Sequence, residues 1–172
     1  ALDDIARAPA ADGETRWITV GARAATRLEA LGESIEAAFP LPGTVHGLTK
    51  LARDMLLEID AMRRETGNWQ VIVYHNLRRE EATALPRRVR LLPLGESWLR
   101  NLRSRRWDGP SLPSFSLSFD RLFASLVGQH LFVTLHRAGA ESLASEHATR
   151  LAAMQAAERN IGDRLEEMNG DY

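Results

Sequence analysis

Residues 142–160 read SLASEHATRLAAMQAAERN, and this stretch decides how the C-terminal part of the chain folds. Alanine is the strongest helix former, the Leu, Met, Gln, Glu and Arg side chains follow it closely, and no Pro or Gly interrupts the stretch. It therefore predicts a helix. The helical pattern continues on both sides, from about Phe119 to Met168, and would give a rod on the order of 75 Å long if it is unbroken. A compact domain of 172 residues does not require such a rod.

The outward side chains of this helix are small, and its apolar stripe is thin. Met154, Ile161 and Met168 recur every seven residues, and Leu151 and Leu165 flank the same side. A repeat of seven is typical of a coiled-coil seam, in which each apolar side chain packs between side chains of a facing helix. The pattern therefore predicts half of a coiled coil, whose partner helix comes from outside these 172 residues or from another chain.

Glu146 and Arg150 are four residues apart on the same helix. At this spacing an acidic and a basic side chain are neighbours on the helix surface and stabilise one another. Two interpretations follow: the pair is an ordinary solvated ion pair, or it presents a charged spot to a partner.

Strand-like and helical segments alternate in the rest of the chain. The pattern predicts strands over residues 16–20, 34–41, 69–75 and 87–94, and helices over residues 22–31 and 44–67. The second of these helices has apolar residues at spacings of three and four, namely Leu48, Leu51, Met55, Ile59 and Met62. Alternation of this kind predicts an α/β fold: a Rossmann-like, mostly parallel sheet with flanking helices, to which the long C-terminal helix is added.

Residues 95–118 are different in character, with two Trp, two Pro and several Ser side chains. They predict a loop with a short strand or a helical turn. We therefore expect two parts, an α/β central domain over residues 1–118 and a long C-terminal helix over residues 119–172.

The composition excludes several classes of protein. The net charge of -1 argues against a general binder of polyanions, and the absence of Cys excludes a disulfide framework and a thiolate metal site. No apolar run approaches the roughly 18 residues that cross a bilayer, and no signal peptide opens the chain, so we expect no direct membrane insertion. The chain opens inside a helical stripe of Leu2, Ile5 and Ala6, and we expect it to be a piece of a longer polypeptide.

The residues that could take part in catalysis or bind a ligand or metal ion are scattered along the sequence and form no recognisable motif. Gly21, between a predicted strand and a predicted helix, lacks the two further glycines of a dinucleotide-binding turn and is interpreted as a tight turn. The five His residues show no metal-binding spacing, and the adjacent acidic pairs point apart along their helices. We predict no catalytic residue, no cofactor and no metal ion.

Residues 78–106 carry nine Arg against three Glu. Such a segment is a solvated face that pairs with acids from elsewhere, or a surface for an acidic protein, or a surface for nucleic acid. Aromatic side chains among the arginines are limited to Trp98 and Trp107, and no recognition motif is present. We therefore expect no nucleic-acid partner.

The sequence SLASEHATRLAAMQAAERNIGDRLEEMN resembles the C-terminal helix of the gamma subunit of F-type ATP synthases. That family has the pattern Leu-Ala-Ser-Glu-x-x-x-Arg-(Met/Leu)-x-Ala-Met-x-x-Ala-x-x-Asn. The pattern is matched here at Leu143, Ala144, Ser145, Glu146, Arg150, Leu151, Ala153, Met154, Ala157 and Asn160. ITVGARAATRL and WQVIVYHNLRREEATALPRRVRLLPL resemble earlier segments of the family, so the resemblance covers about residues 15–168. Ile161 and the EEM sequence are closer to the alternative bacterial (N-type) gamma subunits.

The resemblance implies a central rotor shaft that couples rotation of a membrane ring to conformational change in the catalytic subunits, with no catalytic site of its own. It implies contacts with the alpha and beta subunits, the epsilon subunit and the c-ring, at the cytoplasmic face of the plasma membrane. The implied partner-binding residues are Ser145, Glu146, Arg150, Met154 and Asn160, with Glu146 and Arg150 facing an acidic loop of the catalytic subunits. PSFSLSF (113–119) would lie near the foot that meets the ring, although the family's Tyr-Glu-Pro is not preserved there.

The family also has segments that these residues do not match. They are a long N-terminal helix, a first strand with a Gly-Leu-Cys-Gly segment, and a final segment that enters the catalytic head. The resemblance implies that Ala1–Arg7 end the helix after that first strand, and that the absent N-terminal helix is the coiled-coil partner. An alternative from another class is a small-ligand or nucleotide-binding α/β domain that dimerises through its long helix.

Overall fold

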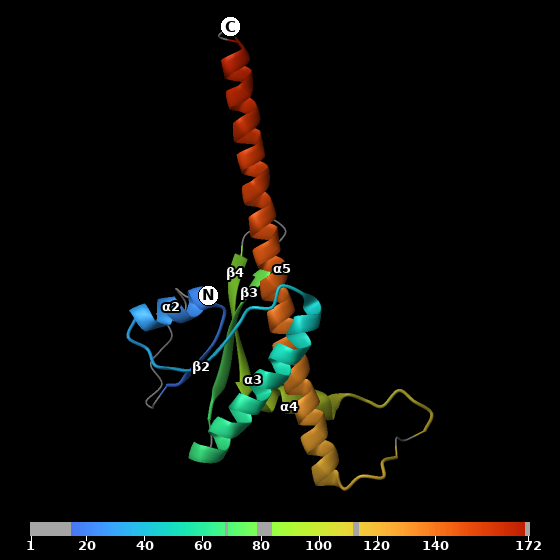
Figure 1. Ribbon diagram of the computed structural model, residues 1–172. Helices are drawn as coiled ribbons and strands as arrows, with labels where there is room; N and C mark the ends of the chain where they lie inside the picture. Colours follow the sequence, from blue (N-terminus) through green and yellow to red (C-terminus); the bar gives the residue numbers. More distant parts are fainter. Residues whose placement is uncertain (1–14, 68, 79–83, 112–113, 171–172) are drawn as a thin grey trace.

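The structure is a computed structural model that describes residues 15–67, 69–78, 84–111 and 114–170 (Figure 1). Its elements are β1 (Trp17–Val20), α2 (Ala22–Ala30), β2 (Ile35–Phe39), α3 (Val45–Thr66), β3 (Val71–Arg78), β4 (Ala84–Leu92), α4 (Glu96–Ser104) and α5 (Phe119–Gly170). The four predicted strands and the two predicted upstream helices are present, within three residues of their expected bounds. The helix end expected at Ala1–Arg7 lies outside the described residues.

The α/β class with a long C-terminal helix is confirmed, but the strand pairing is less parallel than expected. β1 and β2 are parallel and joined through α2, whereas β3 and β4 form an antiparallel hairpin. The connection between β3 and β4 explains the difference, because residues 79–83 are too few for the crossover of a dozen or more residues that parallel strands need. Among the described residues the strands form two separate two-stranded sheets.

Gly21 makes the tight turn between β1 and α2. Its φ of 91° is in the left-handed region, which side chains with a Cβ rarely adopt. Its N–H donates a hydrogen bond to the Phe39 carbonyl at 2.8 Å, so the turn is closed onto the end of β2. This N–H is therefore engaged within the fold rather than directed at a ligand.

The hydrophobic core lies where α3 and α5 cross the face of the β3–β4 hairpin. Its buried members Ala52, Ile59, Leu91 and Leu135 come from α3, β4 and α5. The stripe predicted on α3 lies on this side: Leu48 is 1% exposed, and Met62 is also buried. Gly139 of α5 allows the close crossing, since a Cβ at this position would be 3.0 Å from the Leu48 side chain.

The segment after β4 contains more regular structure than expected. Residues Glu96–Ser104 form the nine-residue helix α4, where the sequence predicted at most a helical turn. Trp98, Leu99 and Leu102 share one face of this helix, but none of its side chains is buried, and nine residues are too few for helical periodicity to be recognised with certainty.

Helix α5 is a single helix of 52 residues, from Phe119 to Gly170, as the composition predicted. At 1.5 Å per residue it is about 78 Å long. Figure 1 shows that its first half lies beside α3 and the strands and that its second half projects beyond them. Its buried residues end at Ser145, so the first half of α5 belongs to the core of the α/β part.

Candidate functional site

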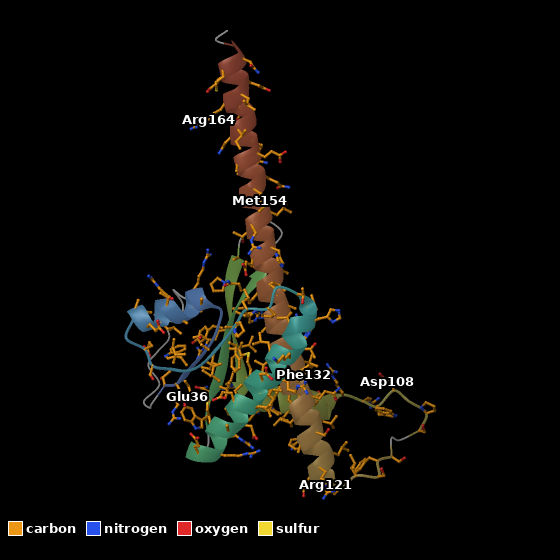
Figure 2. All side chains as sticks on the ribbon, viewed as in Figure 1. Glu36, Asp108, Arg121, Phe132, Met154 and Arg164 are labelled. Carbon is orange, nitrogen blue, oxygen red and sulfur yellow. The ribbon has the colours of Figure 1, made fainter. Side chains whose placement is uncertain are left out.

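The projecting half of α5 is the part of the chain without a covering element among the described residues. Every residue from Glu146 to Met168 is exposed or half-exposed. Figure 2 shows side chains around Met154 and Arg164 that point into solvent, whereas Phe132 lies in the packed region beside α3. Helix propensity keeps this half straight, because its Ala, Leu, Met, Glu, Gln and Arg residues need little tertiary support.

The predicted coiled-coil seam forms one exposed apolar stripe. The side chains of Leu151, Met154, Ile161, Leu165 and Met168 are between 55% and 64% exposed. Soluble proteins rarely leave a continuous apolar surface of this length uncovered, and such a surface usually marks a binding site. Their seven-residue spacing is typical of side chains that a facing helix buries in a coiled coil.

The stripe is longer than the sequence reasoning recognised. Phe119, Leu126 and Val133 continue the seven-residue spacing of Met154 and Ile161 down the helix, and each of the three is more than half exposed. The signal was present, since the repeat extends unchanged to Phe119 through Ala140 and His147. It was missed because these small and polar residues interrupt the run of large apolar side chains.

The packed face of α5 lies on the other side of the helix. Leu135, Ala138 and Leu143 are buried against the α/β part. In a helix with seven residues per two turns, Leu135 and Ala138 lie roughly opposite the stripe of Leu126 and Val133, whereas Leu143 flanks the stripe. Helix α5 therefore has one apolar face that is buried by this chain and one apolar stripe that is exposed among the described residues.

Glu146 and Arg150 form the expected ion pair at the start of the projecting half. The Arg150 Nη2 donates to Glu146 Oε1 at 2.6 Å, and both side chains are about half exposed. An exposed i,i+4 pair contributes only about 0.3–0.5 kcal/mol to stability. The pair is therefore accessible and contributes little to the stability of the fold.

The other candidate partner-binding residues are placed differently from one another. Met154 and Asn160 are exposed on the projecting half. Ser145 is only 3% exposed, and its carbonyl accepts a hydrogen bond from Thr149 Oγ1 at 2.9 Å. Ser145 is therefore buried in this chain, and its partner-binding role stays a prediction.

The arginine-rich segment is partly paired with acids of the same chain. Arg87 Nη1 lies 3.9 Å from Glu141 Oε2, and Arg100 Nη1 lies 3.4 Å from Glu96 Oε2. These contacts agree with the interpretation as a solvated face. In the described ranges no group of three His, Asp or Glu side chains could hold a metal ion, and no helix is long and apolar enough to cross a membrane.

Comparison with known proteins places the chain in a family. The family model described as ATP synthase matches residues 2–172. An ATP synthase gamma chain from Buchnera aphidicola subsp. Schizaphis graminum is 25% identical over 156 residues, which cover 90% of this chain and 52% of that protein. One from Buchnera aphidicola subsp. Diuraphis noxia is 26% identical over 99 residues, or 58% of this chain and 33% of that protein.

A third relative has a higher identity over a shorter stretch. The ATP synthase gamma chain of Granulibacter bethesdensis is 42% identical over 53 residues, which cover 31% of this chain and 18% of that protein. The chain thus spans about half or less of the length of the curated relatives that it matches. Because the family model covers nearly every residue, the chain belongs to the ATP synthase gamma-subunit family.

Proposed function

We propose that this chain is the central part of the rotor subunit of an ion-translocating ATP synthase. In this role it couples the rotation of a membrane ring to conformational change in the catalytic subunits and carries no catalytic site of its own. The observation that supports the proposal most directly is the 52-residue helix, whose second half projects from the α/β part with an apolar stripe exposed. A long, unbroken helix of this kind is suited to transmit rotation from one part of a complex to another.

The coupling follows from differential contact. A rotor changes a catalytic site only if it contacts one conformation of that site more favourably than another. Glu146, Arg150 and Asn160 lie exposed on the projecting half, where a surrounding ring of catalytic subunits would meet them. We assign to Glu146 and Arg150 the charged contacts with an acidic loop of those subunits, because an exposed, weakly held ion pair re-pairs at little cost.

The partner of the exposed stripe is, in this proposal, the N-terminal helix of the same subunit. The relatives are two to three times longer than the segment matched here, which leaves room for such a helix. It would cover Leu151, Met154, Ile161, Leu165 and Met168, and also the lower residues Phe119, Leu126 and Val133. The same upstream region would supply the family's first strand between the two separate sheets.

The remaining partners are assigned by family membership. The alpha and beta subunits would surround the upper part of α5, and the epsilon subunit and the c-ring would meet the lower end near Phe115 and Leu117, which are exposed. The subunit would lie in a membrane-associated complex, peripherally, at the cytoplasmic face of the plasma membrane. The domain boundary between residues 118 and 119 marks the start of the shaft helix in this scheme.

Single-molecule rotation tests the proposal. The full-length subunit is assembled with the alpha and beta subunits of its complex, a bead is attached at the foot, and ATP is added. We expect unidirectional rotation of the bead. ATP hydrolysis by the assembly with a stationary, firmly attached subunit would refute the rotor function.

Calorimetry separates this function from the alternative of a nucleotide-binding α/β domain. We expect no heat of binding when ATP or ADP is titrated into the full-length subunit alone, because the Gly21 N–H is already bonded to Phe39. Micromolar binding that is lost in Gly21→Val would favour the alternative.

A further inference from the structure

A buried polar contact joins the sheet to the long helix. His75 of β3 has a side chain only 5% exposed, and its Nδ1 lies 3.4 Å from Oε2 of Glu141 on α5. In the described part of the chain this Nδ1 has no hydrogen-bond partner. One residue further along each element, the Asn76 N–H donates to Ser142 Oγ at 3.1 Å. Two consecutive residues of β3 thus contact two consecutive residues of α5.

Glu141 is the only acid of this cluster among the described residues, and basic groups surround it. Arg137 Nε donates to its Oε1 at 2.8 Å, and Arg87 Nη1 of β4 lies 3.9 Å from its Oε2. The Glu141 side chain is 18% exposed, so its carboxylate is partly shielded from water, whereas the side chains of Arg137 and Arg87 are 69% and 49% exposed. We call the six residues the shaft–sheet junction; they are His75, Asn76, Arg87, Arg137, Glu141 and Ser142.

The junction has the geometry to fix how α5 is rotated about its own axis. Apolar packing alone tolerates small rotations and sliding, whereas hydrogen bonds weaken steeply when their angles change. Glu146 follows Glu141 by five residues in the same unbroken helix, so the setting at Glu141 determines which way Glu146 points. The junction lies at the last point where α5 is held by the α/β part, since buried residues end at Ser145.

We propose that the shaft–sheet junction sets the rotational position of the projecting half of α5, and that it loosens on acidification when His75 takes up a proton. His75 and Glu141 are positioning residues in this scheme, because they act through Glu146 and Arg150. The proposal rests on the rotor function proposed above and adds to it a pH-dependent control at a defined pair of residues.

The charge balance explains why protonation loosens the contact. Burial, the largest cause, lowers the pKa of His75 below its ordinary value of 6.5. Glu141 and a backbone hydrogen bond at Asn76 raise this pKa, and Arg87 and Arg137 lower it. A proton on His75 would place a third cation around one carboxylate that two arginines already contact. The attraction to Glu141 therefore does not offset the loss of hydration at a 5% exposed imidazole.

The sign of the pH effect follows by linkage. In the open junction His75 is hydrated and titrates near 6.5, whereas in the closed junction its pKa is lower. The open state therefore binds more protons as the pH falls below 6.5, and the closed state loses stability. The open fraction should rise by up to about tenfold per pH unit, until the pH reaches the pKa of the closed state.

The Asn76 amide provides a local probe of the junction, because its N–H is bonded to Ser142 Oγ. Hydrogen exchange of this amide is measured by NMR in the full-length subunit between pH 7.5 and 5.5 and corrected for the intrinsic rate. We expect its protection to fall below about pH 6.5 in the native subunit and to be independent of pH in His75→Asn. His46→Asn, at an exposed histidine of α3, should keep the native pH dependence.

The titration of the His75 imidazole in the native subunit gives a second test that needs no substitution. A midpoint below 6.5 supports the proposal, and a midpoint at or above 6.5 overturns it. Asn76 protection with the same pH dependence in the native subunit and in His75→Asn also overturns it.

The functional test is made in the assembled complex and separates this proposal from the rotor function. We expect the turnover of the native complex to decline on its acid side at a higher pH than that of the His75→Asn complex, with His46→Asn like the native protein. Identical acid limbs in a rotating complex would refute the junction alone. A complex that hydrolyses ATP at every pH without rotation would refute the rotor function.

Discussion

Arg150 illustrates at the scale of single residues how a surface charge differs from a structural one. Its guanidinium pairs with Glu146 on an exposed helix turn, and a pair of this kind contributes little to folding. Arg64 on α3 pairs with Asp60 at the same spacing. The two arginines therefore make similar i,i+4 ion pairs on exposed helix surfaces, although Arg63 also lies 3.6 Å from Asp60.

We expect Arg150→Ala in the full-length subunit to lower coupled ATP turnover several-fold, while the free energy of unfolding changes by less than about 0.5 kcal/mol. Turnover of the assembled complex and denaturant unfolding of the subunit are the measurements. Arg64→Ala is the matched control and should leave turnover unchanged. Equal turnover for both variants would show that Arg150 makes no contact that matters for coupling.

Packing against Leu48 leaves little room for a side chain at Gly139. A Cβ here would lie 3.0 Å from the Leu48 side chain, which is 1% exposed. Gly139→Leu should destabilise the full-length subunit by about 1–3 kcal/mol through overpacking. Gly128→Ala, in the same helix with nothing within 4 Å of the new Cβ, should instead stabilise it by up to about 1 kcal/mol. Thermal unfolding of the two variants measures both, and a destabilised Gly128→Ala would contradict the account.

At the scale of elements, the two halves of helix α5 differ in their surroundings: the first half packs against the α/β part, and the second half projects from it. Its first half contributes Leu135, Ala138 and Leu143 to the core, and its second half has strong helix formers and no covering element among the described residues. The heptad stripe runs along both halves, on the side away from the core. An exposed stripe next to a buried face is consistent with a helix that is sandwiched between its own domain and a second helix.

The stripe leads to a prediction for Ile161, which is 61% exposed here. In the full-length subunit a facing helix should bury it, so Ile161→Ala should cost about 2–4 kcal/mol of unfolding free energy. Arg159→Ala, an exposed position off the stripe, should change it by less than about 0.5 kcal/mol. If the two substitutions have equal and small effects on denaturant unfolding, the stripe has no partner in the subunit.

At the scale of the whole molecule, the α/β part consists of two strand pairs that share one core but not one sheet. β1 and β2 form one pair, β3 and β4 the other, and Ile18 of β1 packs against the core cluster that contains Leu91 of β4. A further strand between the pairs would give β1 and β3 a second hydrogen-bonded neighbour. We therefore expect the complete subunit to be more cooperative than the segment described here.

Hydrogen exchange of the full-length subunit checks this expectation. The amides of Trp17–Val20 and Val71–Arg78 should exchange with nearly the protection of the core of α3, because strands with neighbours on both edges open only with the whole sheet. If one edge of either strand were free in the full-length subunit, its outward amides would exchange many times faster than those that face its partner.

Much of the element order was predictable from the sequence, because periodicity and helix propensity are local properties. The rod from Phe119, the amphipathic helix α3 and the four strands all followed from residue spacing. Helix α4 was not predicted, since its nine residues are fewer than the window of about 11–18 residues over which helical periodicity is recognised. The partner-binding role of the candidate site residues stays a prediction: Glu146, Arg150, Met154 and Asn160 are accessible on the projecting half, and Ser145 is buried.

The sequence by itself determined that the chain ends in a long helix with a seven-residue apolar repeat, because both properties depend only on which side chains follow one another along the backbone. Only the tertiary structure decided which face of that helix is buried and where its support ends. It also decided that β3 and β4 are antiparallel and that His75 meets Glu141. These features depend on contacts between residues that are far apart in the chain, and local spacing has no information about them.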